Sequence, residues 1–124
     1  MAISGMKLRC ALAETNAITL TAASPGVTGG TMAKVEDVVG VYAGDADTGD
    51  SVAFIISAPK ILVPCVAATS GSFAAGAKVY FDADDAEVNE TASGNTLCGV
   101  VLEQPDTGDE EVLIALDGTL GIVA

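Results

Sequence analysis

Four acidic residues between positions 82 and 87 form the stretch of this chain whose types and spacing come closest to a site for chemistry. Asp82, Asp84, Asp85 and Glu87 offer carboxylate oxygens, which are the ligands that hard cations such as Ca²⁺ prefer. The stretch lacks the glycine at the sixth loop position and the terminal bidentate glutamate of an EF-hand. A solvated turn explains the cluster better, so we predict no metal ligands.

The chain also lacks the residues of a catalytic set. It contains no histidine, which removes every Ser-His and Cys-His couple. Cys10, Cys65 and Cys98 are too widely spaced for a zinc motif or a disulfide framework, and we expect reduced, buried thiols. The glycine-rich stretch 71–76 is followed by Ala77 and Lys78 and so misses the Gly-Lys-Ser/Thr of a P-loop. We therefore predict that the protein is not an enzyme, has no catalytic residues and binds no cofactor.

Charge and hydropathy exclude two further classes of partner. The chain has 17 acidic and 5 basic residues, for a net charge of −12. Nucleic-acid binding draws its affinity mainly from lysine and arginine, so we expect no direct contact with nucleic acid. The long uncharged run 61–77 is interrupted by Pro64, Gly71 and Gly76, so we expect no membrane span. The N-terminal stretch does not resemble a signal peptide, because Glu14 cuts its apolar run short, and we expect synthesis in the cytoplasm without export.

The elements that carry these residues are indicated by a repeated motif. Asp-Thr-Gly-Asp occurs at 47–50 and again at 106–109, and Gly40 and Gly99 have the same spacing. An Asp that bonds the backbone two residues on, followed by a Gly that takes positive φ, reverses the chain. Apolar, β-branched runs flank both motifs at 38–42, 52–56, 97–102 and 112–116. We predict two similar β-hairpins.

The two hairpins differ on one face of their returning strands. The first strand has Val52, Phe54 and Ile56 there, whereas the second has Glu111, Leu113 and Ala115. A strand that is apolar on both faces needs cover on both. Half of all residues are apolar but only 4% are aromatic, so the core of one chain is expected to be thin. We predict that Val52, Phe54 and Ile56 contact a second subunit.

The remaining pattern predicts an all-β domain, a small antiparallel β-sandwich or barrel at 17–124. We expect further strands at 17–22, 60–63, 78–82 and 87–89, a loop at 34–37, and at most one short helical turn, at 72–76. Residues 1–16 have no clear period and are predicted to be an N-terminal arm. The apolar and basic residues of this arm are candidates for contact with a partner protein or another subunit: Ile3, Met6, Lys7, Leu8, Arg9 and Leu12.

The stretches 18–22, 76–82 and 94–100, together with the Gly-Asp turns, resemble a family of short tailed-phage proteins. Members of this family are often labelled RecA/RadA-type phage recombinases, while structurally characterised relatives are capsid decoration, or cement, proteins. The resemblance spans about residues 17–118. It implies a homotrimer that binds the outer surface of the major capsid protein and stabilises the capsid of the virion. The missing P-loop and the charge of −12 argue against the recombinase label. Another virion surface module, such as a head-fibre base or a glycan-binding protein, is the alternative.

Overall fold

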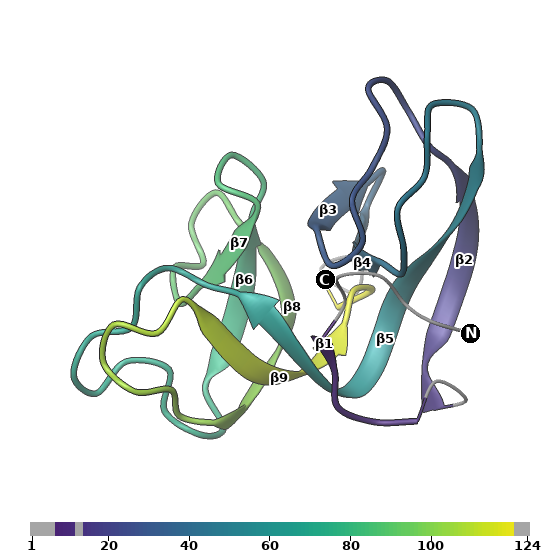
Figure 1. The fold of residues 1–124 in the computed structure, drawn as a ribbon. Coiled ribbons are helices and arrows are strands. Elements are labelled where there is room, and N and C mark those ends of the chain that lie inside the picture. The colour runs from purple at the N-terminus through teal and green to yellow at the C-terminus, as the bar shows by residue number, and fades with distance from the viewer. Residues whose placement is uncertain (1–6, 12–13, 121–124) are drawn as a thin grey trace.

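The computed structural model describes residues 7–11 and 14–120 and shows an antiparallel all-β fold, as predicted. Its sheet has the strand order β3-β4-β5-β9-β8-β6-β7, and β1 and β2 also pair with β5. The sheet curls into two lobes joined by β5 and β9 (Figure 1). The strands in chain order are β1 (Lys7–Leu8), β2 (Asn16–Thr21), β3 (Met32–Val35), β4 (Val38–Tyr42), β5 (Ser51–Pro64), β6 (Lys78–Asp82), β7 (Glu87–Asn89), β8 (Thr96–Glu103) and β9 (Glu111–Asp117).

The two predicted hairpins are confirmed as β4–β5 and β8–β9. In the first turn, the Asp50 amide donates to the Asp47 carbonyl at 2.9 Å, and in the second the Asp109 amide donates to the Asp106 carbonyl at 3.0 Å. The glycine of each turn has nearly the same positive φ, +92° and +93°. The repeated motif is therefore a repeated turn.

Each turn is also anchored to a more distant part of the chain in the same way. Gly49 donates its amide to the carbonyl of Ala22 at 2.9 Å, and Gly108 donates to the carbonyl of Ala68 at 2.7 Å. Both alanines are buried, with 3% of their surface exposed. The alanines lie 46 positions apart, whereas the glycines lie 59 apart.

A third pair of hydrogen bonds repeats this relation. The amide of Gly30 donates to the carbonyl of Tyr42, and the amide of Gly76 donates to the carbonyl of Val101, both at 2.8 Å. Residues 16–117 are thus built from two similar units. Unit 1 (residues 16–57) contains β2, β3, β4 and the first part of β5, and unit 2 (residues 60–117) contains the rest of β5 with β6 to β9.

The units differ between their second and third strands. In unit 1, β3 and β4 are joined by the two-residue turn Glu36–Asp37, with a φ of +54° at Glu36. In unit 2, the corresponding β6 and β8 are separated by residues 83–95, which contain β7. β7 pairs with β6 on the edge that faces away from β8. Unit 1 has no such strand among the described residues.

The prediction of separate strands at 52–56 and 60–63 is wrong, because β5 runs without a break from Ser51 to Pro64. Pro59 lies inside it, where the register with β9 shifts between Ala58 and Ile61. A proline has no amide hydrogen to donate. At a β-bulge one residue is left unpaired, so the sheet loses no hydrogen bond there. One strand therefore belongs to both units, and buried side chains of both form one core cluster.

Two smaller predictions are also wrong. The loop predicted at 34–37 is reduced to the turn at 36–37, because Lys34 and Val35 belong to β3, in which Val35 pairs with Val38 across that turn. Residues 72–76 do not form a helical turn, since Phe73 has a φ of +53° and its side chain is buried in the core. The described residues contain no helix long and apolar enough to cross a membrane.

Candidate partner-binding groove

In unit 1, the chain itself covers the face on which the two hairpins differ. The side chain of Phe54 is fully buried, and its ring centroid lies 4.9 Å from that of Tyr42. Val52 is 7% exposed, and Ile56 is half-buried. The contact of these three residues with a second subunit stays a prediction, and Ile56 is the one with appreciable surface left for it.

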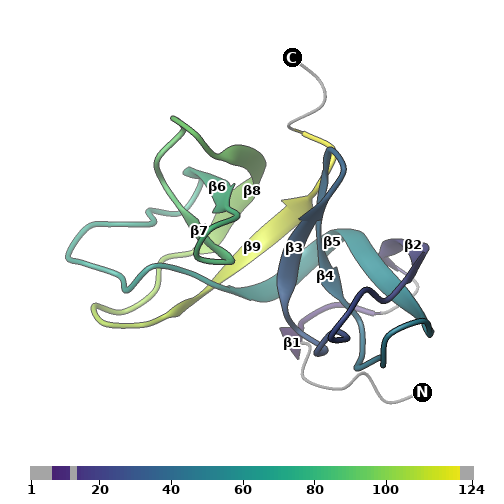
Figure 2. The same ribbon diagram turned by 90° about the horizontal axis from the view of Figure 1, so that it is seen from above.

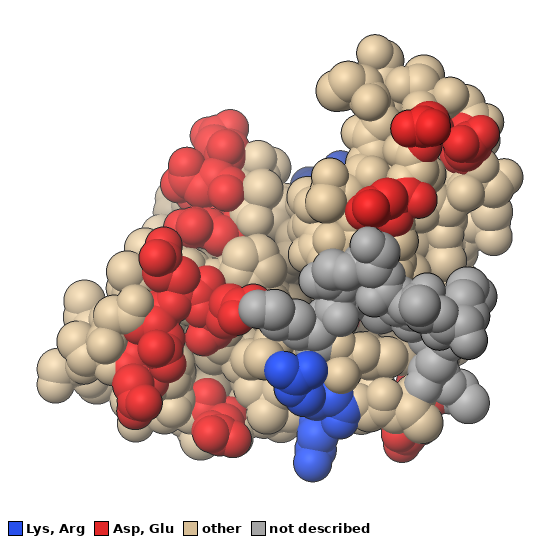
Figure 3. All heavy atoms as spheres, in the orientation of Figure 1, with Lys and Arg blue, Asp and Glu red and all other residues tan. Residues whose placement is uncertain are grey.

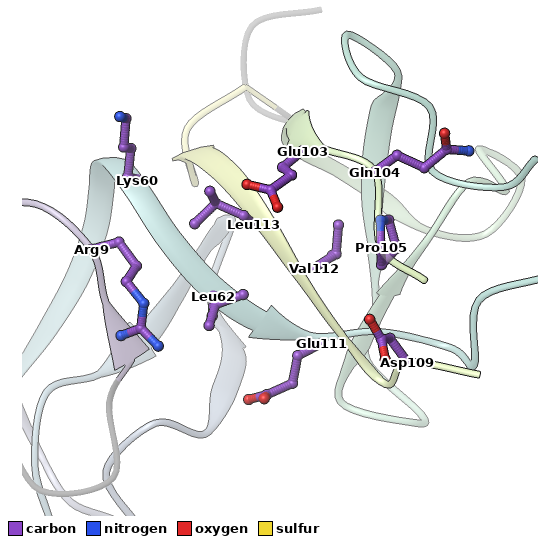
Figure 4. Close-up of a pocket in the computed structure, with 10 residues that line it drawn as sticks. All are labelled: Arg9, Lys60, Leu62, Glu103, Gln104, Pro105, Asp109, Glu111, Val112 and Leu113. Carbon is purple, nitrogen blue, oxygen red and sulfur yellow. The ribbon is translucent and has the colours of Figure 1, made fainter. Parts of the chain in front are cut away.

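In unit 2, the same face is open. Leu113 stands at the position of Phe54 and Glu111 at that of Val52, and the space beside them is a groove of about 460 Å³ (Figure 4). The groove lies between β5, β9 and the segment that follows β8. Leu62, Leu113 and Pro105 provide its apolar surface. Unit 2 therefore has an open groove at the position where unit 1 has the buried ring of Phe54.

Side chains of opposite charge line opposite sides of the groove. Arg9 and Lys60 lie on one side, and Glu103 and Asp109 lie on the other (Figure 4). The two cations are held next to each other because the Arg9 amide donates to the Lys60 carbonyl at 3.0 Å. Basic side chains gather low in the middle of this face, beside the acidic lobe of unit 2 (Figure 3). Glu111 also lines the groove, so the groove combines an apolar surface with two cationic and three acidic side chains.

The predicted arm is joined to this groove by β1. Lys7 pairs with Leu62 and Leu8 pairs with Ile61, so β1 extends the sheet along β5. Leu8 packs against the core, and Arg9 reaches the groove. Of the other arm residues predicted to make contacts, Ile3, Met6 and Leu12 lie outside the described residues.

Sequence reasoning missed Lys60, Leu62 and Leu113 as groove residues. A signal for Leu113 was present, because it is the counterpart of Phe54 in the repeat and is smaller. Lys60 and Leu62 carried none, since they join Arg9 only through the pairing of β1 with β5.

The acidic cluster at 82–87 lies in the turn between β6 and β7. Asp82 accepts the backbone amide of Asp84 at 3.0 Å. Within the described part of the chain, no group of three Cys, Asp or Glu side chains is placed to hold a metal ion. Burial, together with the nearby carboxylates of Asp85, Asp82 and Glu110, raises the pKa of Glu87. The carboxylates of this cluster thus repel one another on the surface of unit 2.

We expect Glu87→Gln to stabilise the protein at pH 7. A carboxyl group whose pKa is raised in the folded state binds protons more tightly there, so its ionised form costs stability at neutral pH. The gain should be about 0.5 kcal/mol or less, since the site is close to solvent. It should fade as the pH falls through the folded-state pKa, because Glu87 then becomes neutral by itself. Thermal unfolding at pH 7 and pH 4 tests this, and an equal gain at both would contradict it.

The three cysteines are free; Cys65 and Cys98 are buried, as predicted, whereas Cys10 is only partly buried. Burial raises the pKa of Cys98 to about 12. Burial and the carboxylates around Cys65, led by Glu87, raise its pKa to about 11. A thiol is nucleophilic only as a thiolate, so neither residue is activated for covalent chemistry near neutral pH.

Comparison with known proteins identifies the family. The family model described as phage cement protein matches residues 12–116. This segment contains most of both units and the β5 and β9 strands that border the groove. No curated protein and no solved structure gives a match. The chain therefore belongs to the phage cement protein family, which supports a structural, capsid-stabilising role in the phage particle.

Proposed function

We propose that the protein is a homotrimeric decoration protein that binds the outer surface of the major capsid protein and stabilises the capsid. The observation that carries this is the open groove of unit 2. One chain fills this face with an aromatic ring in unit 1 and leaves it open in unit 2, with an apolar surface and charged sides. Open apolar surface on a small protein typically marks a site of protein contact.

Charge supports the choice of partner and of capsid face. A net charge of −12 disfavours contact with the packaged DNA and is compatible with the outside of the shell. Arg9 and Lys60 both line one side of the groove, and each provides a donor for a carboxylate or a carbonyl group. We infer that the partner presents such acceptors next to an apolar side chain that contacts Leu62 and Leu113.

Reversing the charge of Lys60 tests this contact. Lys60→Glu should weaken binding to expanded capsids by about tenfold, because it places a like charge opposite the acceptors of the partner. Lys78→Glu makes the same change in net charge at another exposed lysine on a strand, outside the groove. Co-sedimentation with capsids that lack the protein gives both affinities, and equal binding of the two variants would refute the assignment of the groove.

The oligomeric state is tested separately. Light scattering should give a particle of three times the 12.3 kDa of one chain. A strict monomer in solution that is also a monomer on the capsid would refute the trimer, while leaving the groove and its capsid contact to the charge-reversal experiment.

A further inference from the structure

The edge of β3 lacks a strand that its counterpart in unit 2 possesses. Ala33 pairs with Gly40 in β4, and Val79 pairs with Gly99 in β8, so β3 corresponds to β6. The other edge of β6 is covered by β7, whereas β3 is the end of the sheet. In Figures 1 and 2, β3 lies at the outside of the sheet of unit 1, on the side turned toward the other lobe.

The missing strand leaves part of unit 1 uncovered. In unit 2, Val79 is fully buried and the middle residue of β7, Val88, is fully buried as well. Ala33, at the position of Val79, remains partly exposed. An added strand with one apolar side chain directed inward would therefore complete unit 1 as β7 completes unit 2.

The backbone of β3 is also oriented to accept such a strand. The Tyr42 amide donates to the Thr31 carbonyl at 3.0 Å. Because bonded and non-bonded residues alternate along an antiparallel pair, the amides of Met32 and Lys34 point away from β4. No described residue bonds to either of them. An edge with free donors and acceptors is a template for strand addition.

We propose that residues 1–6 of a second copy of this chain add to the outer edge of β3. Ala2-Ile3-Ser4 places one large apolar residue between two small ones and carries no charged side chain. β7 likewise has a single apolar residue, Val88, at its centre. Six extended residues span about 20 Å, which exceeds the length of a four-residue strand such as β3. The segment is therefore long enough and suitably patterned for the position.

The arrangement has a geometric consequence for assembly. Each chain contributes one arm and one edge, and these are different surfaces, so the contact is heterologous and closes into a ring when the rotation allows. The inference rests on the proposed trimer for the number of chains in that ring. The contact between arm and edge can be tested without reference to the capsid.

Lys34→Pro removes one outward amide and places a ring at the edge, while the bonds between β3 and β4 are kept. Lys34→Ala removes the same charge and retains the amide, which makes it the matched control. We expect Lys34→Pro to raise the dissociation constant of the oligomer by about tenfold relative to Lys34→Ala. Circular dichroism at high dilution verifies that both variants are folded. Equal dissociation constants for two folded variants would overturn the proposal.

A mixing experiment identifies the chain that donates the arm. In a Cys10→Ser background, one preparation carries Ser4→Cys and the other carries Lys34→Cys. Mixing and mild oxidation should yield a disulfide-linked pair that contains one chain of each kind. If the link forms only within single chains that carry both substitutions, or not at all, the second copy is not the donor.

Capsid binding distinguishes this inference from the proposed function. Wild-type trimers that bind capsids, with Lys34→Pro equally trimeric, would overturn the arm contact and leave the proposed function standing. Loss of the oligomer in Lys34→Pro, with no capsid binding by the wild type, would support the arm contact and overturn the proposed function.

Discussion

Phe54→Ala should lower the free energy of unfolding by about 3–5 kcal/mol, because truncating a fully buried phenylalanine loses its transfer free energy and leaves a cavity. The side chain has no exposed surface and lies against Tyr42. The equivalent change in unit 2, Leu113→Ala, should cost about 1 kcal/mol, since Leu113 borders an open groove and is only partly buried. Urea denaturation followed by circular dichroism measures both losses.

The comparison of the two variants is the control, because they occupy equivalent positions in the repeat. Leu113→Ala should also weaken capsid binding while leaving the protein folded. Equal losses of stability in the two variants would mean that the groove is closed in solution, and the assignment of a partner to it would then fail.

Gly40→Ala should destabilise the protein by about 1–3 kcal/mol or more, which is the cost of overpacking a well-filled core. A β-carbon at Gly40 would lie 2.6 Å from the Ile55 carbonyl oxygen and 2.7 Å from a ring carbon of Phe54. The strand β4 can therefore pack closely against β5 only because Gly40 has no side chain. Thermal unfolding of the purified variant measures the loss.

Gly44→Ala is the matched control, since a β-carbon at Gly44 meets no heavy atom within 4 Å. This variant should stay within about 0.5 kcal/mol of the wild type. Gly99→Ala, the counterpart of Gly40 in unit 2, should be destabilised as well, because its β-carbon would collide with the Ala115 carbonyl. A Gly40→Ala variant as stable as Gly44→Ala would contradict this prediction, because it would show that β4 can move away from β5 without loss of stability.

The hairpins could be predicted from the sequence because their turns depend on local chemistry. Gly49 and Gly108 take the positive φ that each turn requires. The expected bond from the Asp side chain to the residue two on is not what closes the turns, because both glycine amides donate to Ala22 and Ala68, and backbone bonds between the first and fourth residues close the turns instead. The rest of the duplication consists of backbone hydrogen bonds, such as those to Ala22 and Ala68. Such bonds do not require particular side chains, so they leave no pattern in the sequence. The inserted β7 also changes the spacing between equivalent residues from 46 to 59. A search at one fixed spacing therefore finds part of the repeat only.

The site was predictable in part for a similar reason. The sequence shows that the two returning strands differ on one face, but it does not show which of the two the chain covers. That cover comes from tertiary contacts such as the ring of Tyr42 on Phe54. Pro59 misled the reading of β5, because a proline usually ends a strand and here lies at a shift in register.

The continuity of β5 determines how a pulling force would act on this molecule. A strand of 14 residues extends for about 45 Å, and its covalent backbone passes from unit 1 into unit 2. Tension that draws the two units apart would travel along this backbone. It loads the hydrogen bonds of β2 and β9 with β5 in shear, so that many must break together. The shared strand would thus resist the separation of the two units within each chain.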